Sequence, residues 1–371
     1  MRYEDLRNAV IEHPKYEDCV SIDRAPLLTP GFPGTFNLSF TEDPWLKEYG
    51  RYVDFDRDYT FSTIQSCIRP QDTKLLGTED SWKYLGVFEM SDLTGMINLA
   101  ERLDPTELVT WQIHELVSFF TSLGIPPDRV HPSYCKGGKV GRLTNGKYSF
   151  DREIHEDRIS RNAFLSAKVP ERNLIPDKSR DTFLALHVHR PTPWGYRNEV
   201  NVDIGERGNP KLLDVATVEY LLWAPVFRGD ETSKNIVGLR DLDCSVFITG
   251  IGLERLGMAM QGVQRVQDVD YLRPFYQGVE ELTGGKDYLA AESLRALHRI
   301  YSDVVTRAVR PGKKQKEKIR MLIRNVGYLE LSIRELLKVH SMIQPWHPDL
   351  NEGMEPTIER IRQYREAKSG E

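Results

Sequence analysis

The spacing of apolar residues changes along this chain, and the change limits the folds it can adopt. Alternating apolar residues, typical of half-buried strands, dominate the first two thirds, whereas residues 286–340 show helical spacing almost throughout. We therefore place a boundary near residues 270–286. The predicted units are a domain at residues 1–275, a helical domain at residues 276–345 and a charged tail at residues 346–371.

Individual elements follow from these patterns and from signals at their ends. Asp104 and Pro105 form an N-cap and a first-turn proline, and Gly124 ends the same helix. Further helices are predicted at residues 3–12 and 252–264. The predicted strands lie at residues 35–40, 61–69, 85–90, 183–189, 199–204, 217–223 and 246–250.

Composition excludes several classes of protein. The 371 residues are 40% hydrophobic and 28% charged, which is typical of a globular enzyme and not of a collagen, a coiled coil or a disordered chain. The net charge is −5, so nucleic-acid binding would need a local basic patch. The four cysteines form no C-x-x-C pair, and we expect neither disulfides nor zinc. No segment resembles a secretion signal or a membrane span, which predicts a cytoplasmic protein without membrane contact.

Three residues from separate segments have the chemistry of a nucleotide site. Arg69 ends an apolar strand, Phe88 lies on the expected neighbouring strand, and Arg255 opens a helix after a glycine-punctuated strand. A guanidinium group matches phosphate oxygens with two hydrogen bonds, and an aromatic ring can stack on adenine. Each residue alone is more often a surface ion-pair residue or a core aromatic. Together they favour ATP over metal or nucleophile chemistry.

The sequence around Arg255 resembles a signature motif. Residues 249–256, Thr-Gly-Ile-Gly-Leu-Glu-Arg-Leu, followed by residues 260–263 and 268–270, resemble the third motif of alanyl-tRNA synthetase, a class II aminoacyl-tRNA synthetase. Residues 65–70 and 87–90 resemble the second motif of that enzyme, in which a strand and its return flank a loop. The two motifs occur in the order that the family has.

Weaker similarity extends this resemblance over roughly residues 30–330. Residues 193–195 and 199–205 resemble the glycine–proline turn and acidic strand of the family, and residues 294–326 resemble the helical region after its catalytic domain. The resemblance implies an α+β fold, in which an antiparallel sheet is flanked by helices and followed by a helical domain. It also implies a standalone catalytic core without the editing and C-terminal domains of the parent enzyme.

The resemblance implies that the chain forms an acyl adenylate with ATP and Mg²⁺. Arg69 would hold the α-phosphate and the attacked carboxylic acid, Arg255 would hold the γ-phosphate, and Phe88 would stack on adenine. Attack of a carboxylate on phosphorus joins two anions, so fixed positive charge and Mg²⁺ must neutralise the charge that develops. The candidates for magnesium or ribose contacts are Glu89, Glu199 and Asp203, and the other implied ATP contacts are Met90, Gly250 and Gly252.

Two departures from the family pattern predict an altered amino-acid pocket. The family holds the ammonium group of alanine with an aspartate two residues before the first glycine of the third motif, where this chain has Ile248. An unpaired, desolvated ammonium costs on the order of 3–5 kcal/mol, so another carboxylate must replace it, and Glu219 and Asp243 are the candidates. The family tryptophan beside the substrate methyl aligns with Leu186. The implied pocket also includes Trp194.

A basic stretch in the helical part is the candidate nucleic-acid site. Between residues 310 and 324 only Glu317 opposes the cationic side chains. A solvated helix face is the alternative interpretation, but the resemblance places this stretch where the family contacts the acceptor stem of tRNA. The cations are Arg310, Lys313, Lys314, Lys316, Lys318, Arg320 and Arg324.

The sequence supports three functions. The first is activation of an amino or related carboxylic acid as an acyl adenylate, with transfer to a tRNA. The first alternative is an adenylate-forming ligase that transfers the acyl group to a small molecule or a carrier protein in specialised metabolism. The second alternative is an inactive regulatory paralogue, which Ile248 favours and which the presence of Arg69, Phe88 and Arg255 disfavours.

Overall fold

The structure of the chain is a computed structural model that describes most of its length. The described residues are 1–13, 19–28, 36, 58–69, 71–76, 78–98, 105–140, 152–178, 181–185, 192–206, 209–229, 236–285, 287–326, 329 and 332–369. The strand predicted at residues 35–40 lies outside them apart from Phe36, as does the second half of the strand predicted at residues 183–189.

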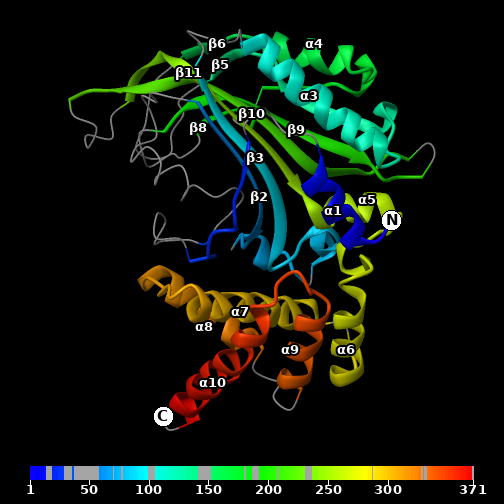
Figure 1. Ribbon diagram of the computed structural model, residues 1–371, viewed down its shortest axis with the longest axis vertical. Coiled ribbons are helices and arrows are strands. Elements are labelled where there is room, and N and C mark those ends of the chain that lie inside the picture. The colour runs from blue at the N-terminus through cyan, green and yellow to red at the C-terminus, as the bar shows by residue number, and fades with distance from the viewer. Residues whose placement is uncertain are drawn as a thin grey trace.

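A nine-stranded sheet forms one half of the molecule (Figure 1). Its strands are β1 (Val20–Ser21), β2 (Tyr59–Cys67), β3 (Phe88–Asn98), β4 (Val130–Cys135), β7 (Ile175–Asp177), β8 (Phe183–Ala185), β9 (Trp194–Asp203), β10 (Leu212–Phe227) and β11 (Ile236–Gly252). The strand order is β1-β2-β3-β11-β10-β9-β4-β7, with β8 paired to β9. All pairs are antiparallel except β1 with β2 and β4 with β7. A separate hairpin consists of β5 (Gly138–Val140) and β6 (Arg152–Ile154).

The centre of the sheet joins the two motif regions. Phe88 lies opposite Cys67 on β2, and Met90 lies between Gln65 on β2 and Gly252 on β11. The predicted strand and its return are therefore confirmed as β2 and β3, and the strand of the third motif lies directly beside them. A site shared by the two motifs would form on this central surface.

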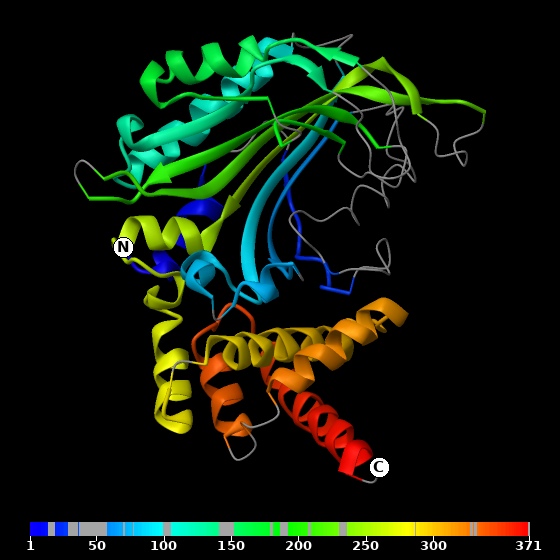
Figure 2. The ribbon, with the colours of Figure 1, turned by 180° about the vertical axis from the view of Figure 1, so that it is seen from behind.

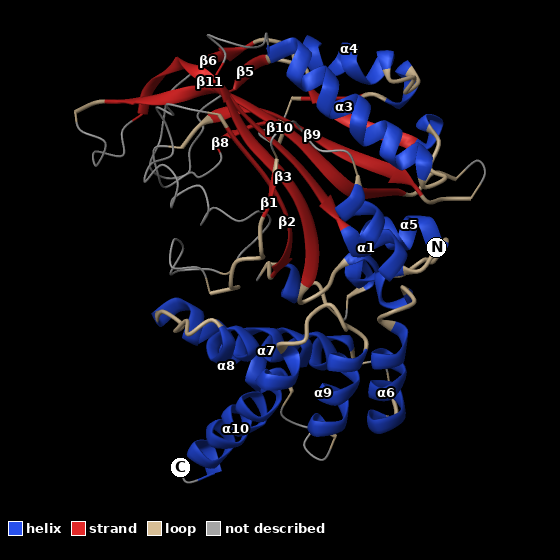
Figure 3. Cartoon of the chain, viewed as in Figure 1, coloured by secondary structure: helices blue, strands red, loops and turns tan. Residues whose placement is uncertain are grey.

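Two helices cover one face of the sheet (Figure 3). They are α3 (Pro105–Ser122) and α4 (Arg158–Ser166). The apolar stripe of α3 is buried, as its spacing predicts, and Gln112 of this helix donates a hydrogen bond to the Thr249 hydroxyl on β11 at 3.1 Å. Asp157 caps the N-terminus of α4 by accepting from the Ser160 N–H at 3.0 Å.

Two more helices lie at the end of the sheet. They are α1 (Tyr3–Glu12) and α5 (Leu253–Gln261), both of which the sequence predicts. α5 continues directly from β11 and ends at Gly262, whose φ of +65° suits the left-handed conformation of a glycine C-cap. The α1 helix packs on α5, where a Cβ at Gly257 would lie 3.3 Å from the Tyr3 ring.

The second half of the molecule is helical and lies below the sheet, as Figure 2 shows from behind. Its helices are α6 (Arg273–Thr283), α7 (Tyr288–Thr306), α8 (Lys313–Asn325), α9 (Ile333–Met342) and α10 (Leu350–Ser369). The central helix α7 is buried on nearly all sides, and Gly353 of α10 lies directly against Ser302 of α7. The residues predicted as a charged tail thus include the packed helix α10.

Buried polar contacts join the two halves. Arg24, which follows β1, donates hydrogen bonds to Asp303 on α7 at 2.7 Å and to Asp349 before α10 at 2.5 Å. His347 lies 2.9 Å from the carboxylate of Glu89 on β3. The predicted fold class, an antiparallel sheet flanked by helices and followed by a helical region, is confirmed. Among the described helices, none combines the length and the apolar character that crossing a membrane requires.

Candidate active site

A cavity of about 170 Å³ lies where the two motif regions meet on the sheet. Arg69 directly follows β2, Phe88 begins β3, and Arg255 lies in the first turn of α5, so three distant segments converge as the sequence predicts. The predicted site residues that line the cavity are Arg69, Phe88, Met90, Glu199, Gly252 and Arg255.

The cations of this cavity are close enough to affect one another. The Arg69 guanidinium carbon lies 5.1 Å from the centre of the Phe88 ring, a cation–π contact. Burial lowers the pKa of Arg69, and the positive charges of Arg255 and Arg197 lower it further. Like charges in one partly buried cavity need counterions, and the carboxylates of Asp72, Glu199 and Asp214 in the same lining supply them.

Arg255 is fixed by contacts to the loop between β2 and β3 and to β10. Its Nε donates to the Lys83 carbonyl at 3.1 Å, and its guanidinium lies 5.5 Å from the centre of the Tyr84 ring. It also forms an ion pair with Asp214, whose other carboxylate oxygen lies 3.6 Å from the Lys83 ammonium. One carboxylate therefore neutralises two cations at the mouth of the predicted phosphate site.

Arg197 is a third guanidinium in the cavity that the sequence analysis missed. It forms an ion pair with Glu199 on the same strand, and its Nε lies 3.5 Å from the Glu219 carboxylate on β10. The signal that could have found it is the two-residue spacing from Glu199, because residues two apart on a strand share a face. Asp214 and Glu254 also line the cavity and were missed.

Glu89 lies beneath this surface rather than in the cavity, because it alternates with Phe88 along β3. It is 4% exposed and accepts hydrogen bonds from the Tyr3 hydroxyl and His347, both at 2.9 Å. Burial alone would raise its pKa, but these donors and the positive charge of Arg7 lower it to about 2. The neighbouring Glu254 accepts from the Glu89 N–H at 2.9 Å, and burial together with the Glu89 charge raises the pKa of Glu254 from 4.5 to about 7.

The remaining predicted contacts are distributed around the cavity. Asp203 accepts from the Gly205 and Lys211 N–H groups at 2.9 and 2.8 Å and so closes the turn between β9 and β10, outside the lining. The structure therefore does not bring Glu199 and Asp203 together, and among the described residues no group of three or more potential ligands could hold a metal ion. Trp194 packs in an aromatic cluster, 6.3 Å from the Phe183 ring centre.

Two of the predicted substrate-pocket residues lie on neighbouring strands of the sheet. Glu219 is directly opposite Ile248 in the pairing of β10 with β11. Burial raises the pKa of Glu219, against the opposing effect of Arg197 and Arg69. Ile248 packs with Met96, Leu221 and Val246. Leu186 and the side chain of Asp243 lie outside the description.

The predicted nucleic-acid residues form one basic surface on and before α8. Lys318 is half-buried, with its ammonium 6.0 Å from the Phe36 ring centre, and the other six cations are exposed. Within the described part of the chain, none of the seven pairs with a carboxylate. Their charge is therefore available to an external anion.

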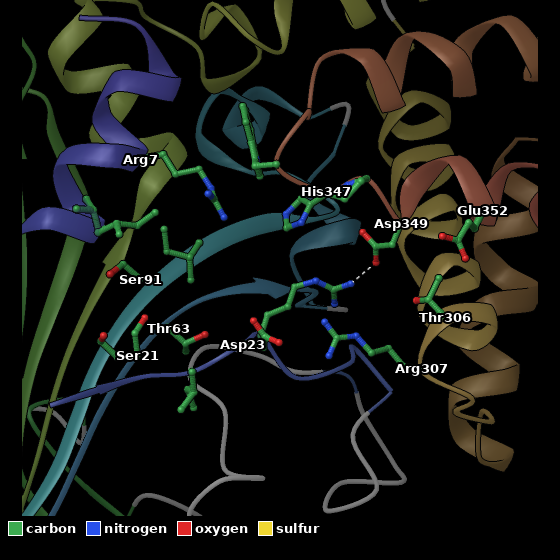
Figure 4. Close-up of a pocket in the computed structure, with 18 of the residues that line it drawn as sticks. Arg7, Ser21, Asp23, Thr63, Ser91, Thr306, Arg307, His347, Asp349 and Glu352 are labelled. Carbon is green, nitrogen blue, oxygen red and sulfur yellow. Dashed lines mark hydrogen bonds and ion pairs between the residues drawn. The ribbon is translucent and has the colours of Figure 1, made fainter.

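A larger cavity of about 780 Å³ lies between α1, β2 and the ends of α7 and α10 (Figure 4). It contains none of the predicted site residues. Arg7 and His347 in its wall both contact Glu89, and Arg24 pairs with Asp349 across it. Its charged groups therefore mainly join the sheet to the helical half.

Comparison with known proteins relates the chain to aminoacyl-tRNA ligases. The relatives are alanine–tRNA ligases, and they confirm the resemblance that the motifs indicate. The enzyme of Rubrobacter xylanophilus is 26% identical over 282 residues, which cover 71% of this chain and 29% of that protein. The enzyme of Streptomyces avermitilis is 30% identical over 49% of this chain and 23% of its own length, and the cytoplasmic enzyme of Bombyx mori is 28% identical over 49% and 17%.

The chain thus spans less than a third of the length of these curated relatives. No family model matches it. Among solved structures, pyrrolysyl-tRNA synthetase from Desulfitobacterium hafniense is similar over 72% of both chains, with 15% identity and a TM-score of 0.32.

Proposed function

We propose that the chain uses ATP to convert an amino acid into an acyl adenylate and then transfers the aminoacyl group to a tRNA. The observation that carries this proposal is the convergence of Arg69, Arg197 and Arg255 with Phe88 in one cavity. Three guanidinium groups provide positive charge for a triphosphate, and the aromatic ring provides a stacking surface for a purine.

The ion pairs of the site suggest how phosphate would bind. Phosphate oxygens would replace Asp214 as the partner of Arg255 and Glu199 as a partner of Arg197. Arg69 would move from the Phe88 ring toward the α-phosphate, which would leave the ring for adenine. For Arg255 and Arg197 the exchange replaces one anionic partner by another, so neither guanidinium is left without a counterion.

In the proposed reaction an oxygen of the substrate carboxylate attacks the α-phosphorus of ATP. The bond from the α-phosphorus to the bridging oxygen breaks, and pyrophosphate leaves with the electron pair. Arg69 would neutralise charge at the α-phosphate and Arg255 at the leaving group, while the fixed sheet orients both reactants. Glu199 lines the cavity and suits Mg²⁺, which proteins usually hold with one or two carboxylates and substrate phosphates and which would supply further charge neutralisation.

Transfer to tRNA is supported by the basic surface of α8. Its exposed cations have no carboxylate partners in the described structure, and phosphate contacts of an RNA backbone require such groups.

The direct test is a pyrophosphate-exchange screen over amino acids and related carboxylic acids, followed by a charging assay with total tRNA. We expect exchange with at least one amino acid and aminoacylation of tRNA. Exchange without charging would favour the alternative, transfer to a small molecule or a carrier protein. Absence of exchange with every acid would contradict adenylate formation and favour a regulatory paralogue.

A further inference from the structure

Residues 85–89, which lead into β3, lie between the candidate active site and the helical half. Leu85 and Phe88 line the cavity, while Val87 belongs to the buried apolar core of the helical half. Leu294 of α7 is part of the same core. This short segment therefore carries both a part of the cavity wall and a part of the core that holds the helices together.

The end of β2 has the same arrangement. Ile68 is 1% exposed and belongs to the same core as Val87, and the next residue, Arg69, lines the cavity. Arg69 and Phe88, the side chains proposed to contact the α-phosphate and adenine, are thus each adjacent to a residue buried against the helices. Because packed interiors transmit strain, a displacement of the helices would move both.

Glu292 of α7 holds the segment with a hydrogen bond. It is fully buried, and its Oε2 accepts from the Gly86 N–H at 2.5 Å. Its other oxygen accepts from the Arg295 guanidinium at 2.7 Å and from the Tyr276 hydroxyl, so the carboxylate is fixed in one position. A Cβ at Gly86 would lie 2.9 Å from the Glu292 carbonyl oxygen and 3.0 Å from the Glu292 Cβ. The backbone at Gly86 is therefore in direct contact with α7.

A second contact comes from the connection between α9 and α10. His347 is 5% exposed, and its Nε2 lies 2.9 Å from the Glu89 carboxylate. The residues on either side of Glu89, Phe88 and Met90, both line the cavity. The Glu89 N–H donates to the carboxylate of Glu254, another residue of the lining. The helical half thus holds the segment from two separate elements.

We propose that Glu292 and His347 are positioning residues for ATP, so that the helical half is part of the adenylation site and not only a surface for tRNA. This inference rests on the proposed adenylation. Neither residue is among the described residues that line the cavity, and each acts through the backbone of β3 and the segment before it. Glu292 fixes this backbone at Gly86. His347 fixes it at Glu89, and between these two points the Phe88 ring is held where adenine would stack.

The main test is tRNA-independent pyrophosphate exchange by Gly86→Ala, with Gly285→Ala as the matched control. The methyl added at Gly86 changes no charge and no hydrogen-bonding group, but it must push the segment away from α7. A Cβ at Gly285 meets no described atom within 4 Å. We expect Gly86→Ala to raise the KM for ATP by about 2- to 30-fold, as for residues that act through a packed network. Gly285→Ala should leave this KM unchanged.

Variants of His347 and Glu292 test the two hydrogen bonds separately. His347→Leu should raise the KM for ATP within the same range, and His347→Gln, which keeps an N–H donor, should remain closer to the wild type. Glu292→Asp keeps a negative charge beside Arg295 but is one methylene too short to reach the Gly86 N–H as well. It should therefore behave like Gly86→Ala.

The KM for ATP distinguishes positioning from a loss of folded protein. A variant that is only destabilised contains less active protein, so its apparent kcat falls while its KM is unchanged. Circular dichroism identifies any variant that does not fold, and if Gly86→Ala is one of them, His347→Leu against His347→Gln decides. Wild-type KM values for ATP in the folded variants would overturn this inference and leave adenylation standing. Absence of wild-type exchange with every amino acid would contradict the proposed function and this inference with it.

Discussion

The guanidinium of Arg255, in the first turn of α5, is paired with the carboxylate of Asp214 on β10. The Lys83 ammonium reaches the same carboxylate at 3.6 Å, and the Arg255 Nε is held by the Lys83 carbonyl at 3.1 Å. Arg255 is therefore held in place by other residues of the chain, and its counterion is a side chain that an anionic ligand can displace. A site arranged in this way loses little conformational entropy when phosphate binds.

Replacing Arg255 should weaken ATP binding by an amount that depends on the charge and shape of the new side chain. Arg255→Ala should raise the Kd for ATP by about 10- to 100-fold, corresponding to loss of a charge-assisted hydrogen-bond pair worth roughly 1.5–3 kcal/mol. Arg255→Lys should retain the positive charge but lose the pair of parallel hydrogen bonds to phosphate. Its Kd for ATP should therefore lie between those of the wild type and Arg255→Ala. Calorimetric titration with ATP measures both. The control is Arg158→Ala on α4, where an exposed arginine is removed, and equal affinities in all variants would refute the phosphate role.

Phe88 should contribute to nucleotide affinity and not to the amino-acid site. Phe88→Leu removes the aromatic face and should raise the KM for ATP by about 2- to 12-fold, since stacking is worth roughly 0.5–1.5 kcal/mol. Phe88→Tyr keeps the ring and should remain close to the wild type. Steady-state kinetics with varied ATP distinguish the two variants. A larger effect on the amino-acid KM than on the ATP KM would argue against stacking on adenine.

Ile248 should be a stability determinant. It is 3% exposed and packs with Met96, Leu221 and Val246. Ile248→Asp buries a carboxylate in this apolar cluster and should lower the free energy of unfolding by about 2–5 kcal/mol, whereas Ile248→Val should cost about 0.5–1.5 kcal/mol. Urea unfolding of both variants is the measurement. A stable Ile248→Asp protein would mean that the cluster is open to solvent or to a compensating cation.

Stability should depend on pH through Glu254. Burial and the neighbouring Glu89 raise the folded-state pKa of Glu254 from 4.5 to about 7. Between these values the folded state binds more protons than the unfolded state, so the contribution of Glu254 to stability is present below about pH 4.5 and is lost as the pH rises to 7. Glu254→Gln keeps a neutral group and should remove this decline, which is on the order of 3 kcal/mol.

The measurement is the free energy of urea unfolding at several pH values between 4.5 and 8 in wild type and Glu254→Gln. The difference between the two proteins isolates Glu254 from other titrating groups. A difference that stays constant over this range would contradict the raised pKa.

Charge reversal on α8 should separate adenylation from tRNA binding. Changing Lys313, Lys314 and Lys316 to Glu should reduce tRNA-dependent turnover and lower the salt slope of tRNA binding by about 1 for each lost phosphate contact. Exchange without tRNA should be unchanged, since α8 lies in the helical half away from the cavity. Lys338→Glu on α9 is the control. If the triple variant charges tRNA normally, the basic surface has another role.

Local signals were sufficient for the elements that carry the site. The proline that begins α3, the alternating residues of β2 and the glycines at the end of β11 are all short-range features, and the structure confirms the elements they predict. The meeting of Arg69 with Arg255 was expected only through the resemblance, because it depends on the pairing of β3 with β11.

The side chains that were missed depend on strand register. Arg197 on β9 and Asp214 on β10 line the cavity with Arg255 only because β9, β10 and β11 are neighbours, and sequence spacing does not specify that order. For Glu89 the sequence alone was sufficient. Adjacent residues of a strand point to opposite faces of a sheet, so a Phe88 that lines the cavity implies a Glu89 that faces away from it. Trp194 packs against Phe183 of the neighbouring strand β8, a contact that short sequence motifs do not predict.

The central claim is that Arg69 acts on the α-phosphate during adenylate formation. The most direct measurement is amino-acid-dependent pyrophosphate exchange by the wild type and by Arg69→Ala, with circular dichroism to show that both are folded. We predict exchange in the wild type and a decrease of about 100-fold or more in Arg69→Ala. Undiminished exchange in folded Arg69→Ala would contradict the account.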